Sequence, residues 1–308
     1  MEQFTIVLNQ LFNFFVMMLI GYAGARLHIL DEALLANISR LIIRLILPIL
    51  IFANGVNQTT RAQLLDCWPI LLLTAGMYAG LITLFWLLAR LQGLSGDHGK
   101  VYRADFIFGN IGFLGLPLIP VIFPQNGAIY LVVMTVIDQI FVWTYGDWLT
   151  TPAGGSSRFS FRNFLNPALG AVVLSVILVM AGIRFPAVLC TPLLTVGRSS
   201  APLSLIYLGG LLHFVDWKRP FRTLELYLGV LFKQILYPLA FYFIAGLLCP
   251  NQEMVRMMTM ISALPTMTTI AMFAASKNNQ GEYAIGTVLA TTIASLFTLS
   301  FVSFVIFR

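Results

Sequence analysis

A small number of ionisable side chains stand inside long apolar stretches of this chain, and they are the first candidates for chemistry. Asp138 lies near the middle of the apolar stretch 126–150 and directly precedes Gln139. A charged group is costly inside a lipid bilayer, so an ionisable residue at that depth commonly marks a substrate, proton or ion pathway. Asp138 is therefore a candidate ion-coupling residue. The alternative is a structural carboxyl bonded to a neighbouring helix.

Basic residues in similar stretches offer contacts for an anion. Arg40 and Arg44 are four residues apart, so they lie on one face of a helix. Each can contact an anion or extend its charged end to the membrane surface. Lys233 can pair with Asp138 or approach an interface, and the sequence does not decide between the two. Asp105 stands at the start of an apolar stretch and is interpreted as a helix cap, because a carboxylate suits the positive end of the helix dipole.

Two apolar stretches contain residues that interrupt a helix. The first, DFIFGNIGFLGLPLIPVIF, has three glycines before Pro117, and the second, MISALPTMTTIAMFAAS, has Pro265 among serine and threonine. Irregular backbone at membrane depth is tolerated only where it is buried in protein or lines a wet cavity, and the amino ends of half-helices attract anionic groups. A simple proline kink is the alternative. The substrate-binding candidates in these stretches are Asn110, Gly112, Leu116, Pro117, Pro265, Thr266 and Thr268.

The elements that must position these residues are membrane helices. Hydrophobic residues make up 59% of the 308 residues, charged residues make up 10%, and the mean hydropathy is +0.89. A soluble domain carries about a quarter charged residues. Apolar runs of about 20 residues, long enough to cross a bilayer, recur along the chain. The sequence predicts an all-α polytopic membrane protein with ten transmembrane helices, at 4–26, 34–56, 68–91, 103–123, 126–150, 164–183, 194–214, 222–248, 253–276 and 281–307.

The basic residues fall in the short gaps between these runs, which is typical of membrane topology and not of a nucleic-acid-binding surface. One set of alternate gaps holds Arg26, Arg90, Lys100, Arg103, Arg158, Arg162, Lys218, Arg219, Arg222 and Lys277. The other set, with the C-terminus, holds Arg61, Arg184, Arg198, Arg256 and Arg308. Positive charge favours the cytoplasmic side, so this imbalance predicts a multi-pass protein of the cell membrane with both termini extracytoplasmic.

The two halves of the chain are alike in the placement of their prolines. Pro48 in the second run corresponds to Pro202 in the seventh, and Pro117 in the fourth corresponds to Pro265 in the ninth. Five runs per half is an odd number, so the second copy must be inverted, as in carriers that hold their substrate near the bilayer midplane. Chance similarity is the alternative. The predicted domains are a first five-helix repeat at 1–150, a short cytoplasmic loop at 151–163 and a second, inverted repeat at 164–308.

Four short motifs stand in the second, fourth, fifth and ninth apolar runs. They are Ser39-Arg40-Leu41 with Leu47-Pro48, then Asn110 with Gly115, Pro117 and Leu118, then Gln139 with Trp143, and finally Ala263-Leu264-Pro265 with Phe273-Ala274. In kind and in order they resemble the motifs of the auxin efflux carrier family, which contains plant PIN-type carriers and many bacterial permeases. The resemblance covers nearly the whole chain.

The resemblance implies a bile-acid-symporter-like, elevator-type fold, with a scaffold subdomain, a transport subdomain and broken fourth and ninth helices that cross. It implies a small organic anion bound near that crossing, and it adds Arg40 and Gln139 to the substrate-binding candidates. Plant carriers have a long loop after the fifth helix, whereas here it is only 151–163, which argues against auxin itself. The expected substrate is a small carboxylate such as malate or malonate, with an auxin-like acid as the alternative. The expected partners are this anion and the lipid bilayer, with the scaffold helices as the surface through which a homodimer would form.

Other classes of function fit the residues less well. Aspartyl proteases of the membrane need two facing aspartates, but Asp138 and Asp147 share one predicted helix, so no enzyme is expected. A primary pump needs a nucleotide-binding G-x4-GK[ST] loop, which the chain lacks. A channel, a facilitator independent of ion gradients and a sensor on a carrier scaffold stay as alternatives. No cofactor or metal site is predicted, and the residues do not decide between H⁺ and Na⁺ as the coupling ion.

Overall fold

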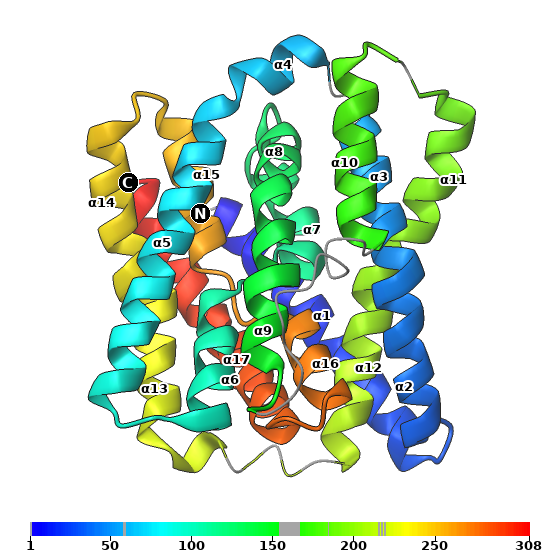
Figure 1. Ribbon diagram of the computed structural model, residues 1–308, viewed down its shortest axis with the longest axis vertical. Helices are drawn as coiled ribbons and strands as arrows, with labels where there is room; N and C mark the ends of the chain where they lie inside the picture. Colours follow the sequence, from blue (N-terminus) through cyan, green and yellow to red (C-terminus); the bar gives the residue numbers. More distant parts are fainter. Residues whose placement is uncertain are drawn as a thin grey trace.

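The computed structural model describes residues 2–57, 60–153, 167–183, 185–214, 216, 218 and 220–308. Over these residues the chain is helical, and its one β-type pairing is an isolated antiparallel bridge between Gly109 and Thr266 (Figure 1).

In the described part of the first half of the chain, nine helices are joined by short turns. They are α1 (Glu2–Arg26), α2 (Glu32–Leu41), α3 (Leu47–Val56), α4 (Arg61–Asp66), α5 (Trp68–Leu91), α6 (Gly96–Ile107), α7 (Leu116–Ile122), α8 (Gly127–Phe141) and α9 (Asp147–Thr150). Three π-helical turns, η1 (Ile42–Ile46), η2 (Ile111–Gly115) and η3 (Val142–Gly146), join α2 to α3, lead into α7 and join α8 to α9. The extra residue in such a turn re-aims the side chains that follow it.

The second half has the same kind of organisation. Its helices are α10 (Pro167–Met180), α11 (Ala187–Arg198), α12 (Ser200–Phe214), α13 (Leu224–Leu231), α14 (Tyr237–Leu248), α15 (Gln252–Ser262), α16 (Thr268–Ser276) and α17 (Gly281–Ile306). A 3₁₀ turn, η5 (Pro220–Arg222), precedes α13, and a π-helical turn, η6 (Phe232–Leu236), joins α13 to α14.

Several helices have the length and composition of membrane spans. Within the described part of the chain, five continuous helices are long and apolar enough to cross a bilayer: Glu32–Val56, Trp68–Leu91, Gly127–Thr150, Leu224–Leu248 and Gly281–Ile306. Large apolar side chains also face outward, for example Leu247 (88% exposed) and Phe297 (75% exposed). An apolar outer surface is stable against lipid, so the fold is that of a multi-pass membrane protein.

Two helix boundaries differ from the sequence prediction in ways that matter for charge. The helix expected at 103–123 begins at Gly96, because the polar segment 96–103 continues the helix instead of forming a gap. Asp105 therefore lies near the end of α6 and not at its start, so the predicted capping role is wrong. The helix expected at 194–214 begins with α11 at Ala187, which places Arg198 inside a helix pair and not in a gap.

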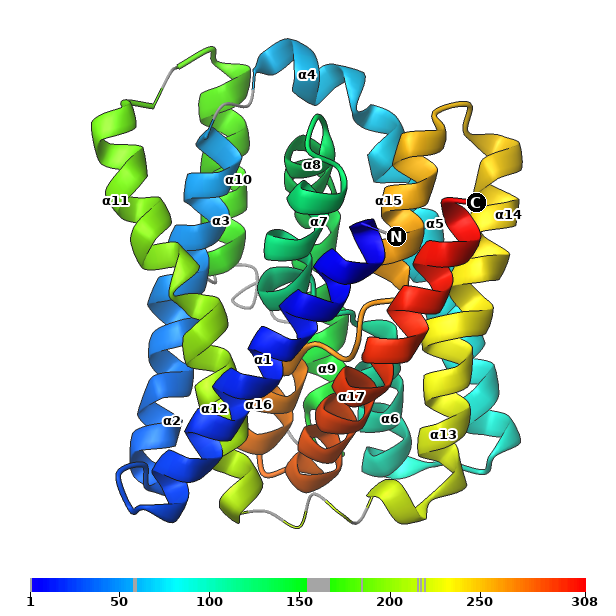
Figure 2. The same ribbon diagram turned by 180° about the vertical axis from the view of Figure 1, so that it is seen from behind.

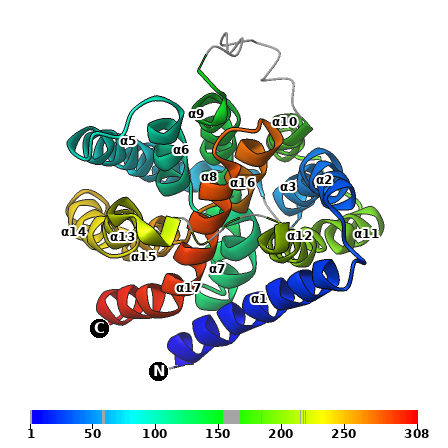
Figure 3. The ribbon, with the colours of Figure 1, turned by 90° about the horizontal axis from the view of Figure 1, so that it is seen from below.

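The helices form two groups. Seen along the long axis of the molecule, α1, α2, α3, α10, α11 and α12 gather on one side and α5, α13 and α14 on the other, with α7, α8, α9, α16 and α17 between them (Figure 3). In the first group α1 packs on α12, and α3 packs on α10 and α11. We call these six helices the scaffold group and the remainder, apart from the short α4, the inner group.

Glycines bring α1 and α12 into backbone contact. A Cβ atom added to Gly209 of α12 would lie 1.9 Å from the carbonyl oxygen of Met18. One added to Gly21 of α1 would lie 2.1 Å from the carbonyl oxygen of Ile206. Small residues allow membrane helices to approach closely, and van der Waals contact along the backbone then holds them together.

A small apolar cluster joins the scaffold group to the inner group. It contains Leu35, Ile42, Leu47 and Ile51 with Ala168, Val172 and Tyr207 from the scaffold group, and Phe113 and Met272 from the inner group. Phe113 and Met272 follow the interruptions of the two broken helices, so the scaffold group touches the inner group next to those interruptions.

The connections alternate between the two ends of the molecule. The α1–α2, α5–α6, α12–α13 and α16–α17 connections lie at one end, and α4 with the α10–α11 and α14–α15 connections lies at the other (Figures 1 and 2). The N- and C-termini are both in the half that carries α4. The orientation expected from the sequence stays a prediction; four of the basic residues on which it depends, Arg158, Arg162, Arg184 and Arg219, fall outside the described residues.

Candidate functional site

The interrupted helices meet at their interruptions. Between α6 and η2 the extended segment 108–110 runs antiparallel to the segment 263–267 between α15 and α16. The Asn110 amide donates to the Pro265 carbonyl at 2.8 Å, and the Met267 amide donates to the Phe108 carbonyl at 3.0 Å. Backbone groups released by one break are thus satisfied by the other, which makes two breaks stable together at a depth where either alone would be costly. We call this contact the crossing.

The two prolines do not play equal parts in the crossing. Pro265 lies in the extended segment itself. Pro117 is the second residue of α7, beyond the break, and η2 (Ile111–Gly115) passes into α7 without a gap, with Gly115 in helical conformation. The fourth helix is therefore interrupted at 108–110, and Pro117 lies within the half-helix that follows.

Asn110 links the two half-helices that follow the crossing. Its Oδ1 accepts from the Phe113 amide at 3.3 Å, in the manner of a helix cap, and its Nδ2 donates to the Thr268 hydroxyl at 3.1 Å. The hydroxyls of Thr266 and Thr269 are buried and have no hydrogen-bond partner among the described residues. Two free hydroxyls beside the amino ends of two half-helices are groups that a bound anion or water would satisfy.

Asp138 belongs to a chain of buried polar side chains. The Tyr78 hydroxyl donates to one carboxyl oxygen of Asp138, and the Gln139 side-chain amide donates to the other at 2.9 Å. Gln139 in turn accepts from the Trp143 indole at 3.0 Å. The carboxyl is 1% exposed. A change in its charge therefore alters the hydrogen bonds of this chain as far as Trp143.

Lys233 reaches the crossing from η6. Its side chain is 1% exposed, which excludes the interfacial position considered from the sequence. Its ammonium donates to the carbonyl of Ile107, the last residue of α6, at 3.3 Å, a favourable place because the carboxyl end of a helix is negative. Among the described residues it makes no ion pair with Asp138, although the two charges influence each other.

A cavity of about 1060 Å³ lies between the scaffold group and the inner group. On the scaffold side it is lined by Ser39, Arg40 and Arg44 of α2 and η1 and by Tyr207 of α12. On the inner side it is lined by Trp143 and by Met272, Phe273 and Lys277 at the end of α16. We call it the arginine cavity. Its wall at Trp143 is the end of the polar chain that begins at Tyr78 and Asp138.

The chain as a whole can be compared with known proteins. A match to the membrane transport protein family covers residues 6–303, nearly the full length. The chain belongs to this family. An uncharacterized transporter of Methanothermobacter thermautotrophicus is 30% identical over 207 residues, which cover 65% of this chain and 66% of that protein. The uncharacterized transporter YfdV of Escherichia coli K12 is 23% identical over 274 residues, 85% of each chain.

Membership of the membrane transport protein family confirms the resemblance to auxin efflux carriers and identifies a transporter, not an enzyme. For this family member, the structure divides the predicted site residues into two sets. Asn110, Pro265, Thr266 and Thr268 meet at the crossing, whereas Arg40 lies in the arginine cavity, with Gln139 one hydrogen bond behind its wall.

The remaining predicted residues border these two sets. Gly112 faces Leu47 of the scaffold group, since a Cβ atom there would lie 3.6 Å from the Leu47 side chain. The side chains of Leu116 and Pro117 lie outside the described part of the structure, although their backbone begins α7. Asn110, Thr266 and Thr268 are each at most 2% exposed and do not line the arginine cavity. The crossing is therefore closed to that cavity in this conformation.

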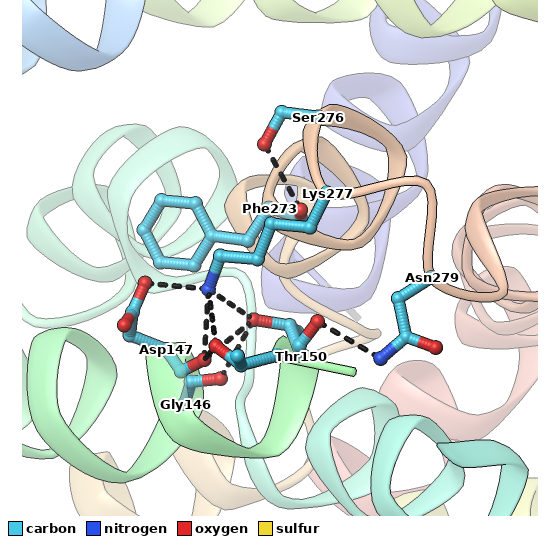
Figure 4. A network of polar contacts seen from close by, with 8 residues as sticks. Gly146, Asp147, Thr150, Phe273, Ser276, Lys277 and Asn279 are labelled. Atoms are coloured by element: carbon cyan, nitrogen blue, oxygen red, sulfur yellow. Dashed lines mark hydrogen bonds and ion pairs between the residues drawn. The ribbon is translucent and has the colours of Figure 1, made fainter. Parts of the chain in front are cut away.

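The described residues contain a further polar cluster that the sequence did not predict (Figure 4). The Lys277 ammonium donates to the Asp147 carboxylate at 2.6 Å and carbonyl at 2.8 Å, and to the hydroxyls of Thr150 and Thr151 at 3.1 Å. Asn279 donates to the Thr150 carbonyl at 3.0 Å. Burial lowers the pKa of Lys277, and the neighbouring Asp147 opposes that change. The cluster ties the α16–α17 connection to the end of α9 at the mouth of the arginine cavity.

Proposed function

We propose that this family member is a secondary active transporter of a small organic anion, such as malate or malonate, that works by alternating access. The observation that carries the proposal is the position of the arginine cavity. It lies between two groups of helices, with guanidinium groups on one wall and the polar chain to Asp138 behind the other.

The lining of the cavity favours an anion. Arg40 and Arg44 are exposed and stand four residues apart, so both guanidinium groups are available to a ligand from one face of the helix. A guanidinium binds a carboxylate through two parallel hydrogen bonds, which gives orientation as well as attraction. Two acidic residues also line the cavity, Glu32 at the start of α2 and Asp147 on the opposite wall. Asp147 is paired with Lys277, and the three basic side chains outnumber the two acidic ones. A volume of about 1060 Å³ leaves room for a small ligand with its water.

The crossing is the place where the substrate is held during transport. Met272, which lines the cavity, stands one helical turn beyond Thr268, so α16 leads from the cavity to the crossing. There the free hydroxyls of Thr266 and Thr269 and the amino ends of two half-helices offer hydrogen-bond donors. An anion needs no fixed positive charge to bind such a group of donors.

Asp138 is the coupling residue of the proposal. It lies on α8, in the inner group, and its hydrogen-bond chain ends at Trp143 on the cavity wall. Binding or loss of a cation at Asp138 changes the hydrogen bonds from Asp138 to Trp143. It thereby changes the position of the Trp143 side chain in the cavity wall that contacts the substrate. We propose that H⁺ or Na⁺ binds here in exchange for or together with the anion.

Alternating access follows if the inner group moves against the scaffold group. We propose ten membrane crossings in two inverted repeats, 1–150 and 164–308, in the cell membrane with both termini extracytoplasmic. The matching breaks in α6–α7 and α15–α16, and the alternation of connections between the two ends, support this arrangement. The interface along which the groups would move includes the small apolar cluster around Phe113 and Met272 and the contacts of α1 with α17 and of α10 with α8. The two ion pairs among the described residues both lie within the inner group.

A thermal-shift screen of the purified protein against malate and malonate, with and without Na⁺, tests the substrate class, because a ligand stabilises the folded state by mass action. We expect a rise in melting temperature that Arg40→Ala removes. Arg61→Ala, on the exposed helix α4, is the matched control and should keep the shift. An equal shift in both variants would exclude Arg40 from the site, and no shift with any small carboxylate would exclude the substrate class.

Counterflow in proteoliposomes tests the mechanism. A carrier preloaded with unlabelled substrate accumulates labelled substrate transiently, and the rate saturates. A channel, the rival reading, gives flux that is linear in the driving force and shows no exchange.

A further inference from the structure

A second carboxyl, besides that of Asp138, is buried close to the crossing in the sequence, three residues before Phe108. Asp105 lies on α6, two residues before that helix ends, and its side chain is 0% exposed. Neither of its carboxyl oxygens forms a hydrogen bond within the described part of the chain. The functional scheme above makes no use of it.

The surroundings of Asp105 suit a neutral acid and not a carboxylate. An ionised carboxyl without partners in an apolar interior is very costly. The negative end of the α6 dipole lies within the same turn and adds to that cost. The described basic groups nearby have other partners: Lys233 donates to Ile107, Arg103 donates to Gly99, and His98 pairs with Glu225.

The Thr287 hydroxyl of α17 is close enough to influence the Asp105 carboxyl, but the two form no hydrogen bond in the structure. The Thr287 hydroxyl donates to the Tyr283 carbonyl at 2.9 Å, so its proton is engaged away from Asp105. The buried carboxyl therefore lacks a hydrogen-bond donor that would stabilise its charge, and desolvation favours the protonated form.

A line of titratable groups leads from Asp105 to a second cavity. The Tyr283 hydroxyl is buried without a hydrogen-bond partner among the described residues, and its electrostatic neighbours are Asp105, Glu225 and Tyr102. The His98 ring lies edge-on against the Tyr283 ring with centroids 4.7 Å apart, and His98 Nε2 is 2.7 Å from the Glu225 carboxylate. His98, Glu225 and Tyr283 all line a cavity of about 840 Å³, which we call the histidine cavity.

We propose that Asp105 is a proton-binding site, separate from Asp138, that exchanges its proton with the histidine cavity through Tyr283 and the His98–Glu225 pair. The balance is simple: one proton leaves the cavity water, passes the Tyr283 hydroxyl and converts the Asp105 carboxylate to the acid. The described residues contain no group of three or more His, Cys, Asp or Glu side chains that could hold a metal ion. The site rests on α6, beside the crossing, so its proton travels with the inner group.

Infrared difference spectroscopy of the purified full-length protein tests the first half of the proposal. The carbonyl stretch of a protonated carboxylic acid is distinct from the carboxylate bands. We expect this band at neutral pH in the unmodified protein and its loss in Asp105→Asn and in Asp105→Leu. Glu282→Gln, at an exposed position of the same cavity, should keep it. An unchanged band in either folded Asp105 variant would overturn the proposal.

The yield of folded protein tests the proposal as well. A neutral acid without partners should be replaceable by Asn or Leu with little loss of folded protein. Failure of both variants to fold, with Glu282→Gln normal, would mean that the charge itself is needed and would also overturn the proposal. The readout does not depend on a substrate, so it stands or fails independently of the organic-anion proposal.

The route is tested by exchange of the Asp105 proton for deuterium. After transfer into D₂O the band shifts at a rate set by access to the cavity. We expect Tyr283→Phe, which removes the hydroxyl and keeps the ring, to slow this shift at least about tenfold, and Glu225→Gln to slow it less. An exchange rate equal to that of the unmodified protein in Tyr283→Phe would overturn the route.

Discussion

Asn110 and Thr268 join the two broken helices side chain to side chain. The amide nitrogen of Asn110 donates to the Thr268 hydroxyl at 3.1 Å. Asn110 stands immediately before η2, and Thr268 is the first residue of α16. Their hydrogen bond therefore connects the two places where a half-helix begins and where the helix dipoles leave partial positive charge. A substrate that binds between the half-helices must compete with this bond or use the same groups.

Asn110→Ala is expected to reduce transport far more than stability. The variant loses a helix cap and one buried hydrogen bond, which together cost about 1–2 kcal/mol. It also loses a group of the proposed binding site, so counterflow should fall at least about tenfold. The measurements are counterflow in proteoliposomes and the melting temperature in detergent.

Asn57→Ala is the matched control for this prediction, because Asn57 directly follows α3, away from the crossing. Its effect on both readouts should be small. A melting temperature of Asn110→Ala so low that the lost folded protein accounts for the lost transport would contradict the assignment of Asn110 to the site.

The sequence predicted the helical spans and the two interruptions because these depend on local composition. Asn110 and Pro265 stand out against apolar neighbours, and no distant contact is needed to see them. For the first break the sequence marks only a stretch of glycines that ends at Pro117. Pro117 itself lies inside the half-helix that begins at Ile111, and only the pairing of 108–110 with 263–267, more than 150 residues away, decides where the backbone opens.

Other parts of the site have no local signal at all. Tyr78 is bound to Asp138 across 60 residues, and nothing near Tyr78 in the sequence marks it. For Asp105 a local signal exists, but it is misleading. Its neighbours in the segment 96–103 are polar enough to suggest a loop, yet they belong to α6. The carboxyl is therefore buried near the C-terminal end of the helix and not at its N-terminal end.

Gly209→Ala is expected to disrupt the scaffold group. The added methyl group would lie 1.9 Å from the Met18 carbonyl oxygen, and both atoms of this contact belong to helix backbones or are fixed to them. Overpacking of this kind costs on the order of 1–3 kcal/mol, and more where neither side can move. We expect a large fall in the yield of monodisperse protein and in its melting temperature.

Gly76→Ala provides the comparison. Gly76 lies within α5, and an added Cβ would meet nothing within 4 Å. Alanine is favoured over glycine inside a helix by about 0.5–1 kcal/mol, so this variant should be as stable as the unmodified protein or more so. Equal behaviour of the two variants would show that α1 and α12 are not in backbone contact.

Lys277→Met should release the α16–α17 connection. The ammonium is the common donor to Asp147, Thr150 and Thr151, and methionine keeps the length of the chain without a donor. We expect faster amide hydrogen exchange at 277–280 and at the end of α9, with little change in α10. Lys218→Met, at another connection of the same end, is the control. Unchanged exchange at 277–280 would mean that the cluster does not hold this connection.

Lys277 should also contribute to the pH dependence of the free energy of unfolding. Burial places its folded pKa below the ordinary value of 10.5. Between these two values the unfolded chain holds the proton and the folded chain does not, so this residue makes the free energy of unfolding rise as the pH rises through that alkaline window. Lys277→Met removes the contribution, and its unfolding free energy should rise less over the same window. Parallel curves for the two proteins would contradict the shift.

Asp138→Asn is expected to separate exchange from accumulation. Asparagine has the shape of aspartate and keeps hydrogen-bonding groups for Tyr78 and Gln139, so the fold and the cavity wall should persist. It cannot take up a coupling cation as a carboxylate does. Counterflow, which needs no ion gradient, should therefore stay within a few fold of the unmodified protein. Accumulation driven by an imposed pH or Na⁺ gradient should fall to the level seen when that gradient is collapsed.

Asp66→Asn, at the exposed end of α4, is the control and should accumulate substrate normally. Full accumulation by Asp138→Asn would remove Asp138 from the coupling scheme, and loss of counterflow by folded protein would assign it to substrate binding instead.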